Sequence, residues 1–115
     1  MNSIFTPILD NFSRQKGVQA CLAVSARDGI AIESNLQIGQ DETRVAALAA
    51  SLYKKARKSA EAAGLGTTGF LQLEAESGRL CMLGGDDVIL VVVGEPHANI
   101  GLIRMELLRA AESLT

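Results

Sequence analysis

The segment Val88–Val93 constrains the fold more than any other part of the chain, because all six of its residues are Val, Ile or Leu. No polar residue alternates with them, so the segment lacks the pattern of a half-exposed strand. It is also far shorter than the ~20 apolar residues of a membrane-spanning helix. A short apolar run of this kind is typical of a strand buried on both faces, which predicts a sheet with covering elements on both of its sides.

Four further segments have the composition or alternation of strands. Val18–Ala26 is mostly apolar, and turn residues at 27–29 separate it from Ile30–Leu36, so this pair predicts a β-hairpin. Later in the chain, the alternating segment Thr67–Glu76 predicts a half-exposed strand. One turn sequence separates this strand from Arg79–Leu83, and a second turn sequence separates Arg79–Leu83 from the apolar run Val88–Val93. This arrangement predicts a meander of three strands.

Three segments have helical periodicity, namely Phe5–Phe12, Gln40–Ala63 and Ile100 to the C-terminus, where Asn99 is a predicted N-cap. The residues of the long middle helix expected to face the sheet are Val45, Leu48, Ala49, Leu52, Ala56 and Ala63. Together these segments give the order α-β-β-α-β-β-β-α. Because the apolar strand needs cover on both faces, we expect a three-layer α/β sandwich with the helices on its two outer layers.

Size and charge exclude several functional classes. The chain has 115 residues and a mass of 12.1 kDa, which predicts one domain spanning residues 1–115. Lys and Arg number 11 against 13 Asp and Glu, so there is no overall basic field and we expect no nucleic-acid binding. The N-terminus has no export signal and no segment can insert into a membrane, so we expect a soluble, cytoplasmic protein.

No motif predicts catalysis, a cofactor or a metal. Residues 64–69 match the pattern G-x-G-x-x-G, but they follow a helix and precede a strand, the reverse of a dinucleotide-binding site, so we interpret them as a helix stop. Cys21 and Cys81 are far apart and His97 is the only histidine, which disfavours a zinc site. We therefore expect buried free thiols and a protein that is not an enzyme.

The basic residues near the end of the long helix, Lys54, Lys55, Arg57 and Lys58, admit two interpretations. Such a group is commonly a solvated helix face that interacts favourably with the C-terminal dipole. Alternatively, it binds an acidic protein partner, because Tyr53 and Arg57 are four residues apart and belong to residue types enriched at interface hot spots.

Self-association is predicted by the segment Thr67–Glu76, which we expect at an edge of the sheet with few Lys or Pro residues to block pairing. Small residues beside the core face of the long helix favour the close approach of a second helix. These features predict a homodimer joined edge to edge. The residues predicted at its interface are Ala46, Ala50, Phe70, Leu71, Gln72, Leu73 and Glu74.

Several motifs together resemble the roadblock/dynein-light-chain family over nearly the whole chain. They are the segment Gly17–Val24 followed by Arg27–Ile30, the Ala-rich middle helix, the turn Gly84-Gly85-Asp86 and the helix start Ile100–Arg104. The resemblance implies a five-stranded antiparallel sheet in the order 2-1-5-4-3. It also implies that the long helix covers one face and the two terminal helices cover the other.

Members of this family dimerise through the third strand and the long helix, and they regulate or scaffold Ras-like small GTPases or serve as motor-complex subunits. Bacterial members include a gliding-motility regulator that acts on its GTPase. The resemblance implies a non-enzymatic dimeric regulator or scaffold whose partner-binding residues are Tyr53, Lys54, Arg57, Lys58 and Glu61. Two alternatives stay open, a structural subunit of a motor or signalling assembly and a small-molecule sensor.

Overall fold

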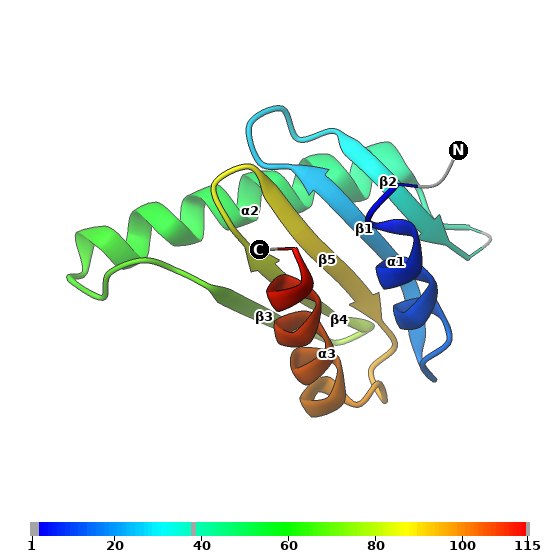
Figure 1. The fold of residues 1–115 in the computed structure, drawn as a ribbon. Helices are drawn as coiled ribbons and strands as arrows, with labels where there is room; N and C mark the ends of the chain where they lie inside the picture. Colours follow the sequence, from blue (N-terminus) through cyan, green and yellow to red (C-terminus); the bar gives the residue numbers. More distant parts are fainter. Residues whose placement is uncertain (1–2, 38, 115) are drawn as a thin grey trace.

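The computed structural model of the protein describes residues 3–37 and 39–114 (Figure 1). The elements are α1 (Thr6–Ser13), β1 (Val18–Ser25), β2 (Ala31–Leu36), α2 (Glu42–Ala62), β3 (Phe70–Ala75), β4 (Gly78–Gly84), β5 (Val88–Gly94) and α3 (Ile100–Ser113). All strand pairs are antiparallel, and the sheet order is β2-β1-β5-β4-β3. The predicted element order, strand order and α/β class are confirmed.

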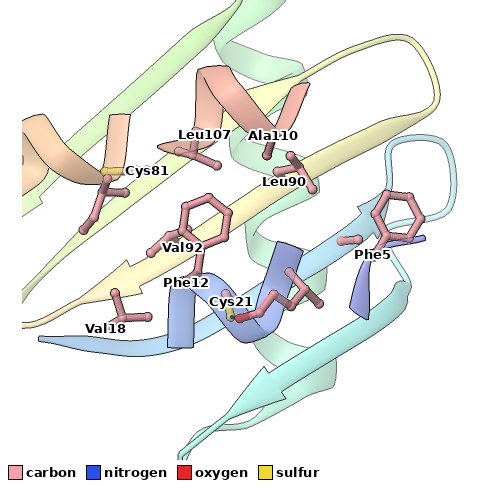
Figure 2. Close-up of a cluster of buried hydrophobic side chains, with 12 residues drawn as sticks. Phe5, Phe12, Val18, Cys21, Cys81, Leu90, Val92, Leu107 and Ala110 are labelled. Carbon is pink, nitrogen blue, oxygen red and sulfur yellow. Dashed lines mark hydrogen bonds between the residues drawn. The ribbon is translucent and has the colours of Figure 1, made fainter. Parts of the chain in front are cut away.

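The sheet lies between two helical layers, as predicted. Helix α2 crosses one face, while α1 and α3 cover the other (Figure 1). Alternation along β1 sends Cys21 and Ala23 toward α1 and α3, whereas Leu22 and Val24 pack against α2. In Figure 2, Phe12 of α1 and other apolar side chains fill the space between the terminal helices and the sheet. The apolar run is the central strand β5, and it is buried on both faces.

Helix α2 has clear start and stop signals. At its N-terminus, the amide of Arg44 donates a hydrogen bond to Asp41 Oδ1 over 3.1 Å. At its C-terminus, Gly64 has φ +75°, the amide of Leu65 donates to Ala60 O and the amide of Gly64 donates to Glu61 O. These two bonds form a Schellman motif, which requires a left-handed residue at Gly64. The interpretation of residues 64–69 as a helix stop is therefore confirmed.

The predicted sheet-facing side of α2 is confirmed only in part. Ala49 is buried, and Val45 and Leu52 pack against the same core, whereas Ala63 is exposed. Leu48, expected to face the sheet, is 61% exposed, while the side chains buried against the sheet include Ala46 and Ala50. Small side chains let the helix approach the strands closely, which a leucine row would prevent. Ala46 and Ala50 are only 0% and 8% exposed within a single chain, so assigning them to a dimer interface was wrong. They belong to the core beneath α2.

Both cysteines are free and buried in the layer between the sheet and the terminal helices. Burial, with a smaller contribution from Asp10, raises the pKa of Cys21 to about 12, and burial raises the pKa of Cys81 to about 11. The thiols are therefore protonated and shielded, as the sequence predicts. Residues 3–37 and 39–114 contain no cluster of three potential metal ligands and no helix long and apolar enough to cross a bilayer.

Candidate functional site

Strand β3 forms one edge of the sheet, and among the residues that the structure describes it pairs only with β4. The register runs without interruption from Phe70 opposite Leu83 to Ala75 opposite Gly78. Within residues 3–37 and 39–114, no strand lies beside its other side. An edge of this kind presents backbone N–H and C=O groups that can pair with another chain. The predicted placement of this segment at an edge is confirmed, although the strand itself is shorter than Thr67–Glu76.

An apolar groove runs between the β3 edge and one flank of α2. Leu48 of the helix and Leu73 of the strand, which is 42% exposed, lie on its rim. The residues that line this groove of about 230 Å³ are Val45, Leu48, Ala49, Leu73, Gly78, Arg79, Leu80 and Val93. Two large leucines exposed beside an open strand edge are typical of a protein contact surface.

The opposite face of β3 is more polar. Phe70 packs beneath the guanidinium of Arg104, which lies 5.1 Å from the ring centroid. Gln72 Nε2 donates a hydrogen bond to Glu74 Oε1 over 3.1 Å, and Arg79 Nε lies 4.0 Å from the same carboxylate oxygen. The five predicted dimer residues Phe70, Leu71, Gln72, Leu73 and Glu74 thus share one edge strand, and their contact with a second copy remains a prediction.

A second groove lies on the other flank of α2, beside the turns that join β1 to β2 and β4 to β5. Its volume is about 400 Å³. The lining residues of this charged groove are Ala26, Arg27, Ala50, Tyr53, Lys54, Arg57, Lys58, Glu61, Asp86 and Ile89. The helix residues among them repeat at the i, i+3, i+4 and i+7 spacing of one helix face. All five predicted partner-binding residues therefore lie around one groove.

Tyr53 forms the floor of the charged groove rather than its rim. Its side chain is 2% exposed, and its hydroxyl donates a hydrogen bond of 2.7 Å to Thr68 O. Burial raises the pKa of Tyr53, while nearby Arg57 opposes that rise. A side chain with so little accessible surface contributes almost no direct contact, so the assignment of Tyr53 as a partner-contacting residue was wrong.

The rim of the charged groove is mainly cationic. Arg57 lies 5.9 Å from the Tyr53 ring centroid and 3.8 Å from Asp86 Oδ1. The side chain of Asp86 is almost fully exposed, so this ion pair contributes less than about 1 kcal/mol to folding stability. Four cations, Arg27, Lys54, Arg57 and Lys58, outnumber the carboxylates Glu61 and Asp86. This charge opposes the net charge of −2 of the whole chain and suits an acidic partner surface.

The sequence interpretation missed two residues of these surfaces. Arg27 was assigned only a role in the β1–β2 turn, and Leu48 was assigned to the core. The signal for Leu48 lies in its spacing from Val45 and Leu52, which forms a row separate from the row of alanines. No local signal connects Arg27 with α2, because only the fold brings the turn and the helix together.

Comparison with known proteins identifies the family. The model of the Roadblock/LC7 domain matches residues 5–94. The uncharacterized protein MJ1340 of Methanocaldococcus jannaschii is 32% identical over 107 residues, covering 93% of each chain. Among solved structures, Myxococcus xanthus MglB superposes with a TM-score of 0.86 at 23% identity, covering 100% of this chain and 90% of MglB. A Roadblock/LC7 domain from Streptomyces avermitilis superposes with a TM-score of 0.82 at 19% identity, covering 93% and 91% of the two chains. Since the domain match spans most of the sequence, this chain belongs to the Roadblock/LC7 family.

Proposed function

We propose that this protein is a non-enzymatic, dimeric regulator or scaffold that binds a Ras-like small GTPase. Family membership and the structural likeness to MglB support the general class. The open edge of β3 and the adjacent apolar groove support a homodimer, because backbone pairing and leucine burial can occur together there. In that dimer the two sheets are continuous across a β3–β3 contact.

The observation that carries the proposal is that one flank of α2 is apolar and the other is cationic. The row of Val45, Leu48 and Leu52 and the row of Lys54, Arg57 and Lys58 lie on different flanks of the helix, with the sheet-facing alanines between them. A dimer that uses the apolar flank therefore leaves the charged groove open. Each copy then presents one cationic groove, which steers an acidic surface of the GTPase into contact.

Capture and titration test this proposal. The tagged protein is incubated with native lysate in the presence of GDP or of a non-hydrolysable GTP analogue, and the retained GTPase is then purified and titrated. The double variant Lys54→Glu, Arg57→Glu is expected to bind the GTPase about tenfold or more weakly while remaining a dimer, because two steering charges are reversed.

A matched control separates the groove from the net charge. Arg14 and Lys16 are exposed just after the C-terminus of α1, and reversing both changes the net charge by the same amount. We expect Arg14→Glu, Lys16→Glu to bind like the wild type. Equal binding by wild type and both double variants contradicts the assignment of the charged groove. Equal binding of the GTPase in GDP and in the GTP analogue favours a structural subunit over a regulator.

A further inference from the structure

The segment that leads from α2 into β3 has few attachments to the rest of the molecule. Residues 64–69 include three glycines, and only Thr68 among them is half-buried. Beyond the Schellman bonds, the described hydrogen bonds of this segment are the two from Tyr53 and one of 3.2 Å from the Gly84 amide to Gly69 O. A glycine-rich segment loses much conformational entropy when it is ordered, so these few bonds decide how well it is held.

Tyr53 joins three elements at this point. Its hydroxyl lies 2.7 Å from Thr68 O and 3.3 Å from Gly69 O, the last two carbonyls before β3. Its ring lies directly on Gly84 at the end of β4, where an added Cβ would lie 2.1 Å from the ring. The ring is thereby fixed on β4, and the hydroxyl is aimed at the start of the edge strand.

The position of this contact matters for pairing. Phe70 is the first residue of β3, and it directly follows the carbonyls that Tyr53 holds. A second copy pairs more tightly with an edge whose backbone is already extended and in register, because ordering a loose strand subtracts from the affinity of the contact. Order at residues 68–70 therefore contributes to dimer affinity without any contact between Tyr53 and the second copy.

We infer that Tyr53 is a positioning residue for dimerisation, which orders the first residues of the β3 edge through its hydroxyl. This inference rests on the homodimer of the proposed function. It gives Tyr53 a role different from that of the rim residues of the charged groove. It also explains why this aromatic side chain is buried on a helix whose C-terminal half is otherwise largely polar and exposed.

The variant Tyr53→Phe tests the inference, because it keeps the ring on Gly84 and removes only the hydroxyl. Sedimentation velocity over a dilution series measures the dimer dissociation constant, and hydrogen exchange measures the protection of amides 68–71. We expect the dissociation constant to rise roughly 5- to 100-fold, since each dimer contains two such hydrogen bonds. Exchange at 68–71 should accelerate in the monomer, while amides of β1 and β5 exchange as in the wild type.

Thr68→Ala is the matched control, because the acceptor is the backbone carbonyl and stays in place. It should change the dissociation constant less than twofold. The inference is overturned if Tyr53→Phe dimerises like the wild type, or if it slows or accelerates exchange equally in all strands, which indicates a general structural role. A wild-type protein that stays monomeric at every concentration instead contradicts the proposed dimer, so the two failures are distinguishable.

Discussion

The two edges of the sheet, β2 and β3, differ in how completely the rest of the chain occupies them. Strand β2 is held by side-chain hydrogen bonds to both helical layers, from Ser34 Oγ to Glu42 Oε2 over 2.6 Å and from Asn35 Nδ2 to Asp10 Oδ1 over 3.3 Å. Ser3 also donates to Glu33. Strand β3 has no comparable bonds to α1 or α2 among the described residues, apart from the Tyr53 contacts that precede it.

Register adds to this difference. In β2 the pairing passes from Ala31 opposite Val24 to Glu33 opposite Ala23, so Ile32 is the extra residue of a β-bulge. A bulge twists an edge and interrupts pairing, whereas β3 is regular along its whole length. Ile32 is 49% exposed and Leu73 is 42% exposed, so exposed apolar area alone does not separate the two edges. Regular backbone and the adjacent leucine of α2 are what favour β3 as the dimer contact.

The largest expected effect comes from placing a charge on one edge and then on the other. Leu73→Asp puts two carboxylates near the dimer axis and removes apolar burial, so we expect the dimer dissociation constant to rise about 100-fold or more. Ile32→Asp makes the same change on the bulged edge and should leave the dissociation constant within about twofold of the wild type. Sedimentation velocity measures the dissociation constants of both variants. A larger increase from Ile32→Asp than from Leu73→Asp indicates that β2, and not β3, is the dimer edge.

A second prediction concerns the support of β3 by the neighbouring strand. Gly84→Ala drives a methyl group into the Tyr53 ring, so it should lower the free energy of unfolding by about 2 kcal/mol. Gly85→Ala is the control, because its Cβ would meet only Val88 O at 3.8 Å, an ordinary contact distance. Urea unfolding of the two variants measures the difference, and equal stability contradicts the packing of Tyr53 on Gly84.

The rate at which each cysteine is chemically modified measures how often the neighbouring edge strand detaches from the sheet. Cys21 pairs with Asn35 of β2, and Cys81 pairs with Gln72 of β3. Because β2 is held by more side-chain bonds, we expect iodoacetamide at pH 8 to modify Cys81 about tenfold faster than Cys21 in the monomeric Leu73→Asp variant. Peptide mass spectrometry identifies the modified thiol. Faster modification of Cys21 shows that β2, rather than β3, is the less stable edge.

The smallest expected effect is on alkaline stability. Both thiols have a folded pKa above the ordinary value of 9.0, so the folded state keeps protons that the unfolded state loses. Their stabilisation is complete below pH 9 and decreases as the pH rises toward 11 and 12. Between pH 8 and pH 10, Cys21→Ala should lose about 1 kcal/mol less unfolding free energy than the wild type. Denaturant unfolding at both pH values measures this, and equal losses contradict the burial of the Cys21 thiol.

Much of the fold could be predicted from the residues, because periodicity and turn chemistry agree along the chain. Helix ends are predicted by the residues next to them. Asn99 Oδ1 accepts a hydrogen bond of 3.1 Å from the Leu102 amide, as expected of an N-cap, and Gly64 ends α2. The strand order instead came from the family resemblance, since no local pattern states which strands are neighbours. The element order and this strand order agree with the structure.

The surfaces were harder to predict than the fold. Two apolar rows on α2 have helical spacing, and the larger side chains of the row with Leu48 made it the more hydrophobic choice for the core. Close packing on the sheet instead buries Ala46 and Ala50 beside Ala49 and leaves Leu48 exposed. Tyr53 and Arg57 have the residue types of an interface, but burial against Gly84 gives Tyr53 a supporting position that only tertiary contacts define.

Hydrogen exchange at two protein concentrations tests the central claim most directly, because it compares the two edges in one sample. At a concentration that favours the dimer, we predict that outward-facing amides of β3 gain protection relative to the dilute monomer, while those of β2 do not change. Gains at β2 with none at β3 would contradict the assignment of β3 as the dimer edge. Equal exchange of β3 at both concentrations would also contradict it, provided that the protein sediments as a dimer at the higher concentration and as a monomer at the lower one.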